Sequence, residues 1–279
     1  WQMDRPPFFL CAPRTRSSIL FETMMYWAND YYGLLPLHNH MELFLEISKN
    51  VLAHDAKTEK SFETELHPVV RSDGIHVHYI WPPMFNNSVE RNSYKLNVLE
   101  ELRDQGKHYN IKGTINLIHT AEQAVEFFSD RHFVITKRRS IVDNTVSFAY
   151  AYMSKLFSAR KNNMQLYIDK LEEGVTIPQQ LLDRIPNHIK EMKQLEDMEL
   201  LLEKKDIPYS IVYYEDMNTE EQIDQTITDL YDTNSWKASL PDNIADLQTI
   251  HVEKDYSKVI KNYDQLVEYI NRAIKGVAT

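Results

Sequence analysis

Cysteine is almost absent from this sequence, since Cys11 is the only one in 279 residues. A single cysteine excludes an internal disulfide, and the Cys and His residues do not have the spacing of a zinc site. No apolar run approaches the ~20 residues that a membrane-spanning helix needs. Residues Trp1–Pro7 also lack the basic start and the apolar stretch of a signal peptide. We therefore expect a protein of the reducing cytoplasm that has no membrane span.

Positive charge is in deficit along the chain. The sequence has 31 Lys and Arg residues against 41 Asp and Glu residues, which gives a formal net charge of −10. An acidic surface repels a nucleic-acid backbone, so this balance argues against nucleic-acid binding as the main function. A small anionic ligand is compatible with the same balance, because it needs only a local cluster of donors.

Apolar runs alternate with helical stripes along most of the sequence. The run Phe8–Ala12 is typical of a buried parallel strand, and a helical stripe follows it from Ser18 to Gly33. This alternation predicts the α/β class, with a parallel sheet flanked by helices on both faces. With 43% hydrophobic residues, the chain fits a single domain over residues 1–279. Further strands are expected at Tyr109–Leu117, His132–Thr136 and Tyr209–Tyr213.

Two segments depart from this alternation. Residues 57–93 form a loop-rich insertion around one alternating strand, Ile75–Ile80, and Lys161–Gly174 is polar and irregular. Long loops in a compact domain are often functional, so we expect both segments to shape the pocket for a substrate. Helices are expected at Met41–Ala56, at Tyr94–Gln105, from Thr120 to Ser129, after Ser140, at Pro178–Lys205 with a break near Pro186, and from near Asn218 and Asn262.

The turn after the first strand is rich in groups that bind anions. A loop between a strand and a helix presents backbone N–H groups and the positive end of the helix dipole. The plain alternative is that a serine only caps the helix and that the arginines are solvated. The pattern of nucleoside triphosphatases, Gly, four residues, Gly, Lys and Ser or Thr, is absent. The loop residues are Pro13, Arg14, Thr15, Arg16, Ser17 and Ser18.

This loop resembles the 5′-phosphosulfate loop of sulfotransferases that use 3′-phosphoadenosine 5′-phosphosulfate (PAPS). In the tyrosylprotein and bacterial glycolipid branches that loop runs Pro, Arg, Ser, Gly, Thr or Ser, Thr or Ser. The resemblance implies a P-loop NTPase-like sulfotransferase fold, with Arg14 at the catalytic position and Thr15, Ser17 and Ser18 around the phosphosulfate. Arg16 stands in this loop where the family has Gly, which leaves open whether the loop is catalytically competent.

A second segment, Phe133–Tyr150, resembles the strand, loop and helix that hold the 3′-phosphate in the same family. The family pattern is an apolar strand, an Arg, an acidic residue four positions later and a Ser eight positions later. Arg139, Asp143 and Ser147 match it. The resemblance implies that Arg139 leaves the strand end to pair with the phosphate while Ser147 donates from the helix. The alternative is a basic strand end beside an ordinary helical serine.

Two further segments bear on the resemblance. Tyr214–Met217 is similar to a Tyr-Glu-Asp-Leu segment of the family, for which we expect a structural role. The Arg-Lys-Gly element near the C-terminus of cytosolic members is not found, and Lys254 and Lys258 are weak candidates for its phosphate contact.

The resemblance implies transfer of a sulfuryl group from PAPS to a hydroxyl or amine, without a metal. The acceptor is a small molecule, a carbohydrate or a lipid, and the oligomeric state is left open. Two alternatives are a P-loop nucleotide or small-molecule kinase and an inactive nucleotide-binding module of the same fold. For the base that removes the acceptor proton, the candidates in order of preference are Glu42, His40 and His119, with His38 nearby.

Overall fold

A parallel sheet forms the centre of the molecule. Its five strands lie in the order β2, β5, β1, β6, β8, and every neighbouring pair is parallel. The α/β class with a parallel sheet is therefore confirmed. The strands are β2 (Leu35–Pro36), β5 (Tyr109–Thr114), β1 (Pro7–Cys11), β6 (His132–Lys137) and β8 (Tyr209–Tyr213). The computed structural model describes residues 5, 7–15, 20, 24, 35–36, 66–70, 76–80, 97, 100, 104, 109–114, 121–154, 159–160, 164–234, 249–250 and 254–277.

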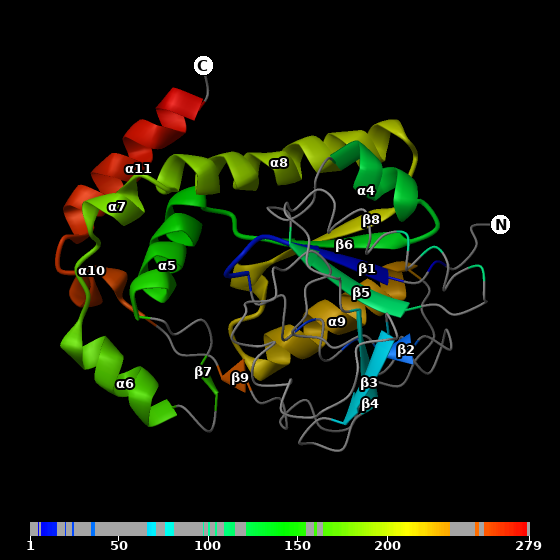
Figure 1. Ribbon diagram of the computed structural model, residues 1–279, viewed down its shortest axis with the longest axis horizontal. Helices are drawn as coiled ribbons and strands as arrows, with labels where there is room; N and C mark the ends of the chain where they lie inside the picture. Colours follow the sequence, from blue (N-terminus) through cyan, green and yellow to red (C-terminus); the bar gives the residue numbers. More distant parts are fainter. Residues whose placement is uncertain are drawn as a thin grey trace.

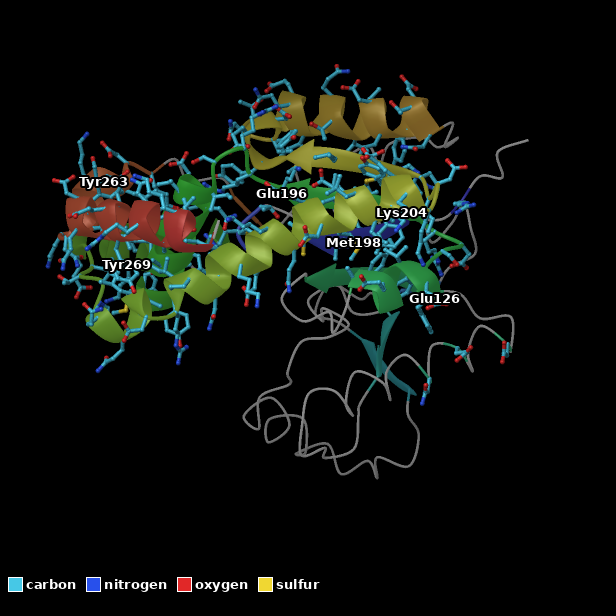
Figure 2. The ribbon with its side chains drawn as sticks, turned by 90° about the horizontal axis from the view of Figure 1, so that it is seen from above. Glu126, Glu196, Met198, Lys204, Tyr263 and Tyr269 are labelled. Carbon is cyan, nitrogen blue, oxygen red and sulfur yellow. The ribbon has the colours of Figure 1, made fainter. Side chains whose placement is uncertain are left out.

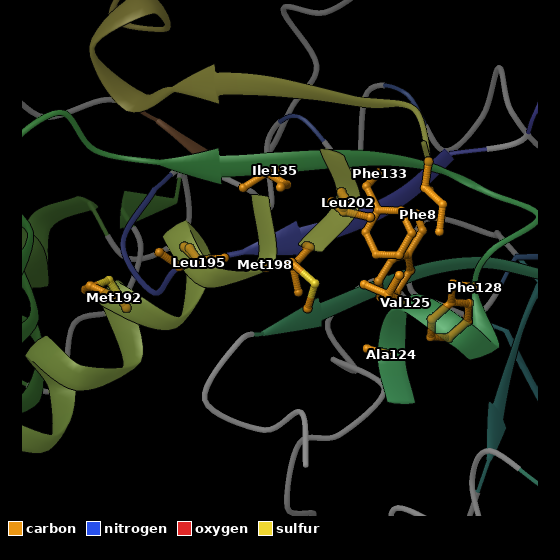
Figure 3. Close-up of a cluster of buried hydrophobic side chains, with 13 residues drawn as sticks. Phe8, Ala124, Val125, Phe128, Phe133, Ile135, Met192, Leu195, Met198 and Leu202 are labelled. Atoms are coloured by element: carbon orange, nitrogen blue, oxygen red, sulfur yellow. The ribbon is translucent and has the colours of Figure 1, made fainter. Parts of the chain in front are cut away.

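Helices cover both faces of this sheet. Helices α4 (Ala121–Phe127) and α8 (Ile185–Lys204) lie over one face, and α9 (Glu220–Asn234) lies over the other (Figure 1). Between the sheet and the first two helices, Phe8 stacks on Phe128 with ring centroids 4.1 Å apart (Figure 3). Strand β1 is buried along its whole length, which is why its sequence is apolar at every position.

A second hydrophobic core lies beside the sheet. It is formed by α5 (Ile141–Ser154), α7 (Gln179–Leu182), α11 (Tyr263–Val277) and the first part of α8. Figure 2 shows α8 running from α11 at one end to the sheet and α4 at the other. The predicted break near Pro186 is confirmed, because α7 and α8 are separate helices and the proline occupies the first turn of α8.

Two sequence predictions are wrong. The 57–93 insertion contains two strands, β3 (Leu66–Val70) and β4 (His76–Ile80), which pair antiparallel, where the sequence indicated only one. Pro68 lies within β3. Both strands of a two-stranded sheet are edge strands, where a proline is tolerated although it has no N–H to donate. The segment expected to be irregular contains helix α6 (Met164–Glu173), whose Tyr167 is buried.

The remaining described elements are short or partial. Residues Asn97, Glu100 and Asp104 are helical, as expected for 94–105, whereas the helix predicted over 41–56 lies outside the described residues. No described helix is both long and apolar enough to cross a membrane. The short elements are β7 (Ala159–Arg160), β9 (Thr249–Ile250), the 3-10 turn η3 (Tyr214–Asp216) and α10 (Tyr256–Val259).

Candidate functional site

The loops that follow β1, β6 and β8 lie at one edge of the sheet, because these neighbouring strands are parallel. Ligands of open α/β sheets bind at this carboxyl edge. The loop after β1 includes Arg14, the loop after β6 includes Arg138 and Arg139, and η3 follows β8 directly. Three segments with chemically active side chains are thus brought together from distant parts of the sequence.

The backbone of Arg14 has an unusual conformation. Its φ of 67° lies in the left-handed region, which costs a residue with a side chain roughly 1–2 kcal/mol. Hydrogen bonds hold the carbonyl group of the preceding residue, Pro13, and that of Arg14 itself. The Asn144 side-chain amide donates to the Pro13 carbonyl at 2.9 Å, and Arg138 Nε donates to the Arg14 carbonyl at 3.0 Å. Strained residues of this kind concentrate at ligand sites.

Three side chains at this edge of the sheet contact the hydroxyl of Ser147. Ser147 is fully buried on α5, and its Oγ accepts from Tyr256 Oη at 2.9 Å. Arg14 Nε lies 3.4 Å from the same oxygen, and Arg138 Nη2 lies 3.5 Å from it. A hydroxyl oxygen has two lone pairs, so it cannot satisfy three donors fully. Two guanidinium groups that meet at a neutral hydroxyl form an arrangement suited to an anion with several acceptor oxygens.

Arg139 makes its contacts with the end of β8 and with η3. Its Nη2 donates to Asp216 Oδ2 at 2.8 Å, its backbone N–H donates to Glu215 at 3.2 Å, and its guanidinium lies 4.4 Å from the Tyr213 ring. The side chain that meets Ser147 is therefore that of Arg138, which the sequence pattern marked only as added positive charge. Successive residues at a strand end project in opposite directions, so a pair of adjacent arginines does not show in sequence which one faces the helix.

Arg138 is held by more than Ser147. Its Nη1 lies 3.4 Å from the Asp143 carbonyl, and its guanidinium stacks 3.7 Å from the centre of the Tyr214 ring. The segment after β8 thus supports both arginines of the β6 loop, which fits the structural role expected for Tyr214–Met217.

A cluster of tyrosines, Tyr150, Tyr167 and Tyr256, lies next to Arg14. Burial raises the pKa of Tyr167 far above its usual value, and the charge of the nearby Arg14 acts in the opposite direction. Lys254 Nζ lies 4.8 Å from the Tyr167 ring and 5.8 Å from the rings of Tyr150 and Tyr256. Lys254 therefore lies beside the site, stabilised by cation–π contacts. The other weak candidate from the sequence, Lys258, is 80% exposed and pairs with Asp255.

Among the other predicted site residues, Thr15 lies in the described part of the chain. Thr15 is fully buried, and its hydroxyl donates to the Ala12 carbonyl at 2.7 Å and lies 2.8 Å from Thr136 Oγ1. These contacts anchor the loop to β6. The predicted residues that lie outside the described part of the chain are Arg16, Ser17, Ser18, His38, His40, Glu42 and His119.

Comparison with known proteins leaves the family open. No family model matches the chain, and no curated protein matches it. Within the described residues, no group of three or more His, Cys, Asp or Glu side chains is arranged to hold a metal ion.

Proposed function

We propose that this protein transfers a sulfuryl group from PAPS to a hydroxyl or amine of an acceptor. The observation that carries the proposal is the meeting of Arg14 and Arg138 at the buried hydroxyl of Ser147. The two arginines come from loops after neighbouring parallel strands, and the serine comes from the helix that follows the second strand. Arg14 and Ser147 agree with the two motifs that resemble the PAPS-dependent sulfotransferases, whereas Arg138 stands where the second motif has Arg139.

The proposed reaction needs stabilisation of the leaving group and a base for the acceptor proton. The acceptor atom forms a bond to sulfur while the bond between sulfur and the bridging phosphate oxygen breaks. 3′-Phosphoadenosine 5′-phosphate (PAP) leaves with that electron pair, and the acceptor proton passes to a base. Arg14, with the loop through Ser18, stabilises the negative charge that grows on the bridging oxygen. For the base we propose Glu42, with His40 as the second candidate.

The 3′-phosphate is assigned to the side of the site that lies on α5. Arg138 and Ser147 are the donors that we propose for it, because they already share a hydrogen bond. Arg139, which the sequence motif assigns to this phosphate, reaches it only by leaving its ion pair with Asp216. We further propose the P-loop NTPase-like sulfotransferase fold, since an anion loop follows a strand in the middle of a parallel sheet. The acceptor is proposed to be a small molecule, a carbohydrate or a lipid.

The test is thermal unfolding of the purified protein with PAP, with adenosine 5′-monophosphate, or with ATP and Mg²⁺. We expect PAP to raise the melting temperature in the presence of a chelator, because a ligand that binds only the folded state stabilises it. Adenosine 5′-monophosphate, which lacks the 3′-phosphate, is expected to have a much smaller effect. No shift at saturating PAP would count against the proposal, and a shift with ATP and Mg²⁺ alone would favour a kinase.

A further inference from the structure

A buried pair of polar side chains lies behind the Arg14 loop. Asn144 on α5 and His188 on α8 are each 2% exposed. Asn144 Nδ2 donates to the Pro13 carbonyl at 2.9 Å, and His188 Nε2 lies 2.9 Å from Asn144 Oδ1. The three groups form a chain of hydrogen bonds from α8 through α5 to the residue before Arg14.

The direction of each hydrogen bond in this chain is determined. The Pro13 carbonyl can only accept, so the Asn144 amide must turn its NH₂ group toward it. Asn144 Oδ1 then faces His188 and must accept, which requires the proton on His188 Nε2. His188 therefore fixes the orientation of the amide that holds Pro13.

The Pro13 carbonyl controls the geometry of Arg14. In a trans peptide the C=O and the following N–H point in opposite directions. Holding the Pro13 C=O toward Asn144 therefore fixes the direction of the Arg14 N–H. The Arg14 carbonyl is held in turn by Arg138. Arg14 thus lies between two fixed peptide planes, which maintain its left-handed φ of 67°.

Packing alone does not account for a histidine at position 188. Its ring stacks on Phe148 with centroids 4.1 Å apart, in a setting that an apolar side chain would also fill. Within the described residues, its Nδ1 is buried without a hydrogen-bond partner, and the Glu191 carboxylate lies 3.6 Å away. An unpaired buried nitrogen is costly. A histidine can form a hydrogen bond to Asn144 that an apolar residue cannot, in addition to its longer contact with Glu191.

We propose that Asn144 and His188 are positioning residues that set the backbone of Arg14 for anion binding, with His188 acting through Asn144. The nucleotide part of this inference rests on the proposed function, whereas the part that concerns the geometry of Arg14 does not.

The first experiment is a double-mutant cycle read out as PAP affinity by calorimetry. We expect Asn144→Leu and His188→Met each to weaken PAP binding by about 3- to 10-fold, the value of one hydrogen bond. His188→Met should cause no further loss when Asn144 is already Leu, because its effect passes through Asn144. His188→Gln, which keeps a donor at the place of Nε2, is expected to restore affinity to within about twofold. Thermal melting confirms that each variant is folded.

The second experiment needs no nucleotide. In protein labelled with ¹⁵N-arginine, the Nε–Hε signals of Arg14 and Arg138 are assigned with Arg→Lys variants. We expect the Arg14 signal to move in the Asn144→Leu and His188→Met proteins but not in His188→Gln. If wild type fails to bind PAP, the proposed function fails while this measurement still tests the positioning pair. An Arg14 signal unchanged in both folded apolar variants, or losses from them that simply add, would overturn the inference.

Discussion

Arg14 combines strain and charge in one residue. Its left-handed φ is a cost that glycine would avoid, yet the chain keeps a guanidinium there. The contacts that hold it come from Asn144 and Arg138, more than 120 positions away. A strained residue that is held in place by contacts from distant parts of the chain is typical of a functional position.

The first prediction concerns Arg14→Ala. If the guanidinium acts mainly as the bond to sulfur breaks, turnover should fall by ~10²- to 10³-fold while PAP affinity falls much less. Steady-state kinetics and calorimetry measure the two quantities. Arg14→Gly is the control, because it removes the guanidinium but suits the left-handed backbone. Equal losses of turnover and affinity in both variants would make Arg14 a binding residue only.

The second prediction separates the adjacent arginines after β6. Arg138→Ala should weaken PAP binding by roughly 10- to 150-fold, the value of a charge-assisted hydrogen bond of ~1.5–3 kcal/mol. Arg139→Ala should have a smaller effect, because its guanidinium already pairs with Asp216 in an exposed setting. Titrations with PAP and with adenosine 5′-phosphosulfate, which lacks the 3′-phosphate, give the comparison. A larger loss from Arg139→Ala, confined to PAP, would return the 3′-phosphate to Arg139, as the sequence motif implies.

At the scale of elements, α5 is the platform of the site, because it presents both Asn144 and Ser147 to the β1 loop. Its first turn is capped by Ser140, whose Oγ accepts from the Asp143 N–H at 3.1 Å, as the sequence predicts. Helix α9 begins with a comparable cap, in which Thr219 Oγ1 accepts from the Gln222 N–H at 3.2 Å.

The third prediction compares these two caps. Ser140→Ala and Thr219→Ala should each lower the free energy of unfolding by about 1 kcal/mol, measured by urea denaturation. Only Ser140→Ala should also weaken PAP binding, because fraying of the first turn of α5 disturbs Asn144 and Ser147. If both variants change affinity equally, α5 has no special role as a platform.

The C-terminal part of the chain is joined to the segment that follows α6. Val175 donates to the Val259 carbonyl and accepts from the Lys261 N–H, both at 2.8 Å. Gly174 makes this close approach possible, since its φ is +66° and a Cβ there would lie 3.1 Å from the Val259 carbonyl. This connection sets Lys254 and Tyr256 beside Arg14 although they lie more than 200 residues later.

At the scale of the whole molecule, one buried histidine links stability to pH. His132, at the start of β6, is 6% exposed, and its Nε2 lies 2.9 Å from Ser210 Oγ on β8. Burial, together with the charge of Arg5, lowers the pKa of His132 from 6.5 to about 4. The unfolded chain therefore binds a proton between these values while the folded protein does not.

The fourth prediction follows from the sign of this shift. The contribution of His132 to stability is complete above pH 6.5 and is lost as the pH falls toward about 4, by about 3 kcal/mol in total. Urea denaturation across this range measures the slope. His132→Gln keeps a donor for Ser210 but does not titrate, so its stability should depend less steeply on pH. An equally steep slope in this variant would contradict the assignment.

The sequence by itself determined the framework of this protein. The apolar runs at Phe8–Ala12, His132–Thr136 and Tyr209–Tyr213 predicted three strands of the sheet. The first run is apolar at every position because β1 is buried along its whole length. The Ser140 cap and the polar loop after β1 followed from rules that act within a few residues. These local rules also predicted an anion-binding loop between the first strand and the helix that follows it.

Only the tertiary structure decided which side chains meet at that edge. Arg138 instead of Arg139 lies at Ser147, Tyr256 reaches the same hydroxyl from 109 residues away, and His188 reaches the loop through Asn144. The prediction for α6 was wrong although a short apolar stripe is present, since Met164, Tyr167 and Leu171 recur at helical spacing and pack together. Contacts between distant residues depend on the direction of each side chain after the helices have packed, and no spacing within one segment encodes that direction.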